Sequence, residues 1–150
     1  MGDAEKDQFR RILHQQCEFA EIQLLTYCVM ANHFHALVRV PPKLDLSDTE
    51  MVRRAAALYG RRNQYVQILE DNLKDGKLRK DLRAALQARF ADVSSLMKEL
   101  KQRFSRWFNH RHKRFGTLWA ERFKSLLVED TAEAVGMVAR YIDLNPVRAG

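Results

Sequence analysis

The sequence is poor in the residues that mark several specialised classes of protein. It has two cysteines, Cys17 and Cys28, which lie among apolar neighbours and lack the paired spacing of a zinc or redox motif. A disulfide scaffold is therefore excluded, and we expect free thiols in a reducing compartment. The six glycines form neither a Gly-rich phosphate loop nor a Gly-x-Ser-x-Gly elbow, which excludes these nucleotide-binding and hydrolase signatures.

Long apolar runs are also missing. No stretch approaches the ~18 apolar residues of a membrane span, and no N-terminal apolar region precedes a small-residue cleavage site. With 150 residues and 46% hydrophobic content, the chain fits one compact domain over 1–150. We expect a cytoplasmic protein.

Positive charge is concentrated in one part of the chain. The net charge is +7, and residues 98–124 hold nine Lys and Arg against two acids, whereas the rest of the chain has 17 of each sign. A surface of this kind favours an anionic partner, with nucleic acid ahead of a membrane. The candidates for DNA contact are Arg103, Arg106, Arg111, Lys113, Arg114, Arg122 and Lys124.

The basic block also carries six aromatic rings. Rings among cations can stack on unpaired bases while the cations hold phosphates. However, the helical spacing of Phe104, Trp107 and Phe108 also fits a buried face, so we expect most of the rings to be structural.

The periodicity along the chain predicts a mixed architecture. A short amphipathic helix is expected over 4–16, followed by strands over 22–30 and 35–40. Helix formers dominate from Ser47 to Asn109, with Ser47 and Glu50 as a capping box, and a further strand is expected over 125–128. A last helix is capped by Asp130 or Thr131 and ends near Pro146. Strands and helices do not alternate regularly, so the expected class is α+β.

His33-Phe34-His35 is the sharpest chemical feature. On a strand, residues i and i+2 point to one face, so the two imidazoles can converge on one divalent ion while Phe34 points into the opposite layer. The last helix offers an oxygen donor in Asn145, and Tyr141 lies one helical turn before it. An ion held there would polarise a scissile phosphate for attack by the tyrosine oxygen.

Two other groups compete for these roles. His110-x-His112 is a second histidine pair, but it lies among cations that disfavour a bound dication, so we interpret it as phosphate contact or solvated surface. Tyr59, with Asn63 four residues later, is the alternative nucleophile.

Three segments together resemble a known family. Met30-Ala31-Asn32-His33-Phe34-His35-Ala36-Leu37-Val38 resembles the His-hydrophobe-His strand of the HUH single-strand nucleases. The segment from Tyr141 to Gly150 resembles the tyrosine helix of their REP-associated tyrosine transposase and IS200-like branch, and Arg114–Phe123 resembles the connecting segment of that branch.

The resemblance implies a ferredoxin-like antiparallel sheet and a transposase chemistry. Family members cut single-stranded, hairpin-forming DNA, form a 5′-phosphotyrosine with a free 3′-OH, and rejoin strands by the reverse reaction. The resemblance implies that Tyr141 is the nucleophile and that His33, His35 and Asn145 are the ligands of Mg²⁺ or Mn²⁺.

The sequence departs from the family in two places. The strand that the family has before its first helix is missing, so the sheet would expose an edge or take a strand from a partner, as in a swapped homodimer. Residues 43–93 form a helical insertion without a match.

These departures leave an alternative open, namely a catalytically inactive nucleic-acid-binding relic of such a transposase. A small helical interaction module is a third hypothesis, but it does not explain the flanking motifs. The enzyme hypothesis also implies a bacterial-type, nucleoid-associated protein.

Overall fold

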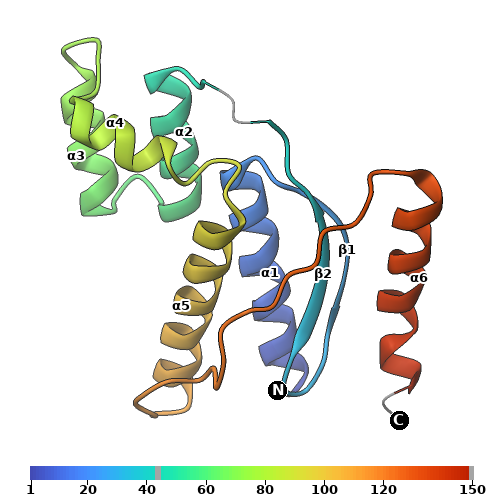
Figure 1. The fold of residues 1–150 in the computed structure, drawn as a ribbon. Coiled ribbons are helices and arrows are strands. Elements are labelled where there is room, and N and C mark those ends of the chain that lie inside the picture. The colour runs from blue at the N-terminus through green and yellow to red at the C-terminus, as the bar shows by residue number, and fades with distance from the viewer. Residues whose placement is uncertain (43–44, 149–150) are drawn as a thin grey trace.

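The computed structural model describes residues 1–42 and 45–148 and has an α+β fold, as the sequence predicts (Figure 1). Positions 43 and 44, at the start of the predicted insertion, and the last two residues of the tyrosine motif lie outside the described residues. The elements in chain order are α1 (Asp3–Ala20), β1 (Gln23–Val29), β2 (Phe34–Arg39), α2 (Asp48–Tyr59), α3 (Gln64–Leu73), α4 (Lys80–Gln87), α5 (Val93–Arg111) and α6 (Ala132–Arg148).

The sheet consists of β1 and β2, an antiparallel hairpin among the described residues. The backbone N–H of Met30 donates to the carbonyl of His33 at 2.9 Å, which closes the turn. A register irregularity between Leu24 and Thr26 adds one residue to β1. Beyond it, side chains alternate between the two faces, and each face packs against a different set of helices.

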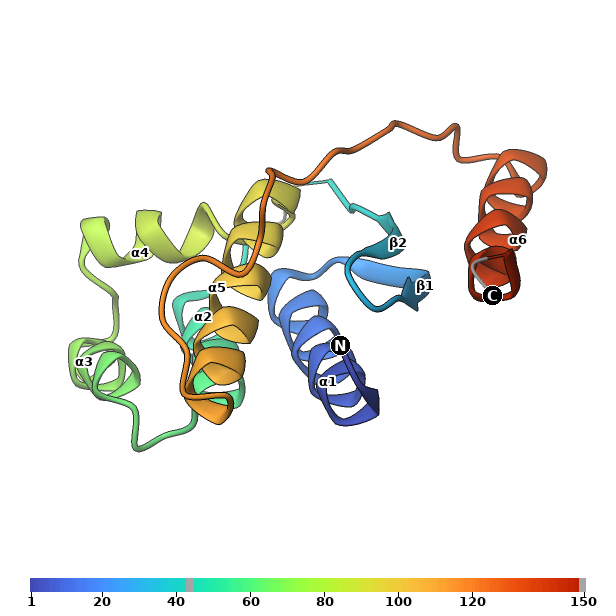
Figure 2. The same ribbon diagram turned by 90° about the horizontal axis from the view of Figure 1, so that it is seen from below.

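One face of the sheet packs on the main core. Phe9 of α1 is fully buried, and its ring centroid lies 4.7 Å from that of Phe34 on β2 and 5.2 Å from that of Phe104 on α5. Because α1 lies between the sheet and α5, the apolar stripe of α1 joins two layers (Figure 2). The predicted orientation of Phe34 into this layer is confirmed.

The helices of the 43–93 stretch pack into the same apolar cluster. Met51 of α2, Leu69 of α3 and Leu86 of α4 are each 0% exposed and belong to it. The hydroxyl of Ser47 accepts a hydrogen bond from the N–H of Glu50 at 3.2 Å and caps α2, as the capping pattern predicts. Asp48 accepts hydrogen bonds from the N–H of Leu78 at 2.8 Å and from the Arg83 guanidinium at 2.9 Å.

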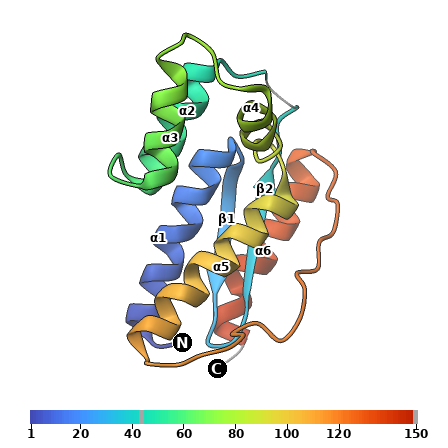
Figure 3. The same ribbon diagram turned by 90° about the vertical axis from the view of Figure 1, so that its left-hand side faces the viewer.

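The other face of the sheet carries α6, which is separate from the remaining helices (Figure 1). Viewed from the side of α1 and α5, α6 lies behind the sheet (Figure 3). Cys28, Leu37 and Ile142 form the buried centre of this smaller cluster. The hydroxyl of Thr131 caps α6 by accepting from the N–H of Ala134 at 3.2 Å.

Two predicted helix ends and one predicted strand are wrong. The first helix continues four residues beyond the predicted end, to Ala20, because Cys17, Phe19 and Ala20 remain on its buried side. The last helix continues through Pro146 to Arg148, since a proline in a last turn removes only one donor from the helix. Residues 125–128 form no strand, because no described strand neighbours them, and Leu126 and Leu127 are fully exposed instead.

Both cysteines are free and buried, as expected. Burial raises the pKa of the Cys17 thiol to about 11, so this side chain behaves as a small apolar residue of the core.

Replacing Phe9 by alanine tests its role between the layers. We expect Phe9→Ala to lower the free energy of unfolding by about 3–5 kcal/mol, because it leaves a cavity among the rings of both layers. The control Phe115→Ala removes a ring that is 97% exposed and should change stability by less than about 0.5 kcal/mol. Urea unfolding followed by circular dichroism measures both, and equal effects of the two variants would contradict the packing described.

Candidate active site

The β1–β2 hairpin brings the two histidines together. His33 is the last residue of the turn and His35 is the second residue of β2, so both side chains leave the strand on the face that carries Leu37 and α6. Their ring centroids lie 5.2 Å apart, with the rings nearly perpendicular at 89°. Two nitrogen donors are therefore adjacent at one end of the sheet.

The ring of His33 is oriented by its neighbour. Nδ1 of His33 lies 2.8 Å from the amide oxygen of Asn32. Because an amide oxygen only accepts, Nδ1 carries the proton and donates, which leaves the lone pair of Nε2 free. A hydrogen bond of this kind fixes the tautomer of a metal-binding histidine.

His35 is disposed to remain neutral. Burial against α6 lowers its pKa from the ordinary value, and the nearby His33 lowers it further because two positive imidazoles repel each other. A neutral imidazole is the form that binds a metal ion.

Tyr141 faces this pair from α6. Its ring centroid lies 6.2 Å from that of His35 at an interplanar angle of 78°, and the side chain is 52% exposed. The tyrosine is thus both next to the histidines and open to a large substrate. Tyr141 lies more than 100 positions after the two histidines in the sequence, and the fold brings it next to them.

Three contacts hold α6 on the sheet. Ile142, adjacent to Tyr141, is buried against Cys28 and Leu37. The hydroxyl of Thr26 on β1 donates to the Asp143 carboxylate at 2.6 Å. At the far end of β2, the Arg39 guanidinium donates to both carboxylate oxygens of Asp130, at 2.7 to 3.1 Å, just before α6 begins.

Asn145 lies one helical turn after Tyr141, where the predicted spacing requires it. Its side-chain nitrogen is buried and has no hydrogen-bond partner among the described residues. No described contact joins it to either histidine. Within the described part of the chain, no three His, Cys, Asp or Glu side chains form a metal-binding cluster.

The competing candidates lie elsewhere. His112 pairs with Glu5, with Nε2 at 3.1 Å from the carboxylate, and packs on Phe108. The hydroxyl of Tyr59 is bound to Arg89 and Glu99, and burial raises its pKa. Tyr59 is therefore held by its own network and does not face the His33–His35 pair.

The seven predicted DNA-contact residues fall into three groups. Arg103 and Arg106 lie on α5. Arg111, Lys113 and Arg114 surround its C-terminus, where Arg111 approaches Glu5 at 3.8 Å and the Arg114 guanidinium lies over the Phe108 ring. Arg122 and Lys124 are exposed on the connection to α6.

The aromatic rings of residues 98–124 are mainly structural, as expected. Phe104 is fully buried and Trp119 packs on Phe9 and Phe34, whereas Phe115 is exposed.

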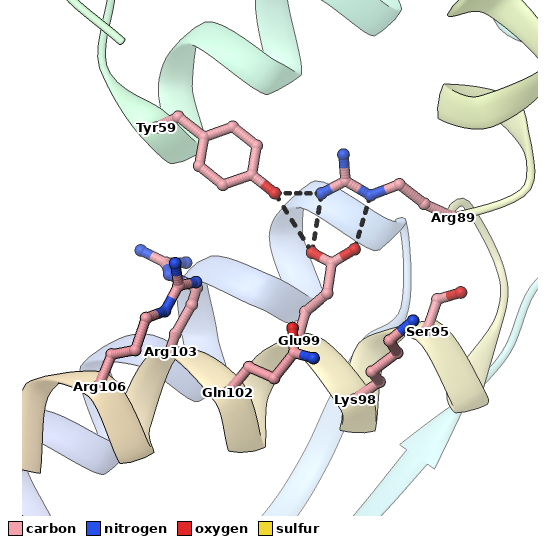
Figure 4. Close-up of a pocket in the computed structure, with 8 residues that line it drawn as sticks. All are labelled: Tyr59, Arg89, Ser95, Lys98, Glu99, Gln102, Arg103 and Arg106. Carbon is pink, nitrogen blue, oxygen red and sulfur yellow. Dashed lines mark hydrogen bonds and ion pairs between the residues drawn. The ribbon is translucent and has the colours of Figure 1, made fainter. Parts of the chain in front are cut away.

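Sequence reasoning missed a pocket between α5 and the end of α2. Figure 4 shows Tyr59, Arg89 and Glu99 joined there by hydrogen bonds, with Lys98, Arg103 and Arg106 beside them. The Arg89 guanidinium donates to both carboxylate oxygens of Glu99 at 2.7 Å. The spacing of Lys98, Gln102 and Arg106 by four residues was the available signal, since it puts all three on one helix face.

Comparison with known proteins gives a family match within the first half of the chain. Residues 1–71 match the family described as "Transposase IS200 like", a match that includes α1, the hairpin and both histidines. This similarity supports a transposase-type function and DNA as the partner. No curated protein and no solved structure matches the chain. The described residues contain no helix that is long and apolar enough to cross a membrane.

The attachment of α6 can be tested by Ile142→Ala. Since Ile142 is the buried contact between α6 and the sheet, its truncation should speed hydrogen exchange of the α6 amides while leaving those of α1 protected. Met137→Ala removes a side chain on α6 that is 62% exposed, so it should leave the hydrogen exchange of both α6 and α1 unchanged. Unchanged exchange in Ile142→Ala, measured by mass spectrometry, would contradict this attachment.

Proposed function

We propose that this protein is a metal-dependent endonuclease and strand transferase acting on single-stranded, hairpin-forming DNA, with Tyr141 as the nucleophile. The observation that carries the proposal is the placement of the Tyr141 ring 6.2 Å from His35, which itself lies 5.2 Å from His33. The transposase match over residues 1–71 supports the substrate class.

The chemistry balances without a further reactant. The phenolic oxygen of Tyr141 attacks the scissile phosphorus, the bond from phosphorus to the 3′ oxygen breaks, and the phenolic proton is transferred in the net reaction to the departing 3′ oxygen. The products are a 5′-phosphotyrosine and a free 3′-OH. Attack by a 3′-OH on the phosphotyrosine reverses the step, because one phosphodiester replaces another.

The residues present fit a divalent ion such as Mg²⁺ or Mn²⁺. His33 offers Nε2 with its tautomer set by Asn32, and the lowered pKa of His35 favours its neutral form. Asn145, one helical turn after Tyr141, would supply its amide oxygen as a further ligand. Histidine nitrogen suits Mn²⁺ better than Mg²⁺. When bound, the ion would withdraw electron density from the scissile phosphate.

The exposure of Tyr141 suits a polymeric substrate, since half of its side chain is open to solvent on the outer helix. A homodimer is compatible with this proposal, because a tyrosine on a helix attached to one face can serve the histidines of its own chain or of a partner. A cytoplasmic, nucleoid-associated location would place the protein at its DNA substrate.

Labelled hairpin oligonucleotides test the nucleophile. With Mn²⁺, the wild-type protein should become covalently attached to a 3′-labelled strand, while a 5′-labelled strand should yield a shorter free product. Tyr141→Phe should form no adduct, because phenylalanine lacks the attacking oxygen. Denaturing gels measure both outcomes.

Matched variants make the result specific. Tyr59→Phe should retain the adduct, since Tyr59 is bound within the Arg89–Glu99 network. His33→Ala and His35→Ala should lose it, and His110→Ala should not. An adduct that persists in Tyr141→Phe would overturn the assignment, and DNA binding without any adduct would favour the inactive relic.

A further inference from the structure

The outer face of α5 carries two adjoining hollows that the transposase chemistry does not use. Both are lined by Gln102 and Arg106, so these two residues form the ridge between them. The first hollow, of about 360 Å³, extends toward Arg89 and the end of α2. The second, of about 550 Å³, lies between α5 and the connection that follows it.

The first hollow has an excess of positive charge. Arg89, Lys98, Arg103 and Arg106 line it with a single carboxylate, Glu99, which already accepts two hydrogen bonds from Arg89 at 2.7 Å. Glu99 therefore neutralises the charge of Arg89, and the other three cations lining the hollow have no carboxylate there. Cationic side chains without a carboxylate partner around a hollow favour binding of an anion that can accept hydrogen bonds from two of them at once, such as a phosphodiester.

Arg103 offers a donor to such an anion. One of its terminal nitrogens donates to Gln15 at 3.1 Å, and the other is buried with no hydrogen-bond partner among the described residues. Burial lowers the pKa of this guanidinium from its ordinary value, although an arginine stays charged at neutral pH. A buried donor without a partner is costly, and an anion in the hollow would satisfy it.

The second hollow has a different character. Trp119 and Leu118 line it, together with Gly116 and Thr117. The connection is fixed against α5, because the indole N–H of Trp119 donates to the carbonyl of Lys101 at 3.1 Å and the amide of Asn109 donates to the carbonyl of Gly116 at 2.9 Å. The Trp119 ring also packs on Phe9 and Phe34, and the Lys101 ammonium lies 5.2 Å from its centroid. A base in this hollow would therefore contact only the part of the ring that lines it.

We propose that these two hollows form a second binding surface for single-stranded DNA, with a phosphate held by Lys98, Arg103 and Arg106 and a neighbouring base against Trp119. The inference takes DNA as the partner from the proposed function but does not depend on its chemistry. A duplex would not offer this surface an unpaired base, whereas a single strand presents a base and a phosphate together. The views in Figures 1 and 2 place α5 and α6 on opposite sides of the sheet, so this surface holds DNA away from the reacting phosphate.

The charge requirement can be measured with a fluorescent oligothymidine. Lys98→Gln combined with Arg106→Gln should weaken binding at least tenfold in about 0.1 M salt and reduce the steepness of the salt dependence, because two phosphate contacts are removed. The control combines Lys77→Gln, before α4, and Lys80→Gln, at its first residue, which remove two exposed charges and should change affinity less than twofold. Arg103→Gln should also weaken binding. Equal loss in both double variants would mean that only overall charge matters and would overturn the proposal.

The base requirement needs a second probe. An abasic strand with the same phosphates should bind the wild-type protein several-fold more weakly than oligothymidine, since it cannot contact Trp119. Equal binding of the two strands would overturn the base subsite.

The covalent assay separates the two proposals. Tyr141→Phe should bind oligothymidine as the wild type does, because Tyr141 lies on the other side of the sheet. Normal binding by the Lys98 and Arg106 double variant together with adduct formation in the wild type would refute only the α5 surface. Loss of binding in that variant without any adduct in the wild type would refute only the strand-transfer chemistry.

Discussion

The alternation of side chains along β2 is the constraint on which the rest of the structure depends. Phe34 points to Phe9 and anchors the strand in the main core, and the same geometry forces His33 and His35 to the opposite face. A shift of one residue in register would exchange the two faces and place histidines in the core. The packing of Phe34 on one face of β2 thus fixes the positions of His33 and His35 on the opposite face.

The two faces differ in the strength of their packing. The helices on the Phe34 side share a continuous apolar cluster, whereas α6 rests on a small cluster with Ile142 at its centre and on polar contacts from Thr26 and Arg39. The candidate nucleophile therefore lies on the least extensively packed helix. This division suits a protein whose rigid part holds the histidines while its outer helix presents a tyrosine to a large substrate.

Local patterns were enough to predict much of this. The strand alternation predicted the shared face of the histidines, and the four-residue spacing predicted that Tyr141 and Asn145 share a helix face. The strand expected over 125–128 did not form, because β-forming residues need a neighbouring strand and none of the described strands supplies one. The Arg89–Glu99–Tyr59 network was missed since its members come from separate helices and connections, and only tertiary packing brings them together.

Selective line broadening by Mn²⁺ is the most direct test of a shared centre. In aromatic NMR spectra, we expect the signals of the His33, His35 and Tyr141 rings to broaden together at low Mn²⁺, because one bound ion would be near all three. The rings of His110 and Tyr59 should remain sharp at that concentration. Broadening confined to His110 and His112, or the histidine pair broadening while Tyr141 stays sharp, would contradict the proposal that these residues form one metal-dependent centre.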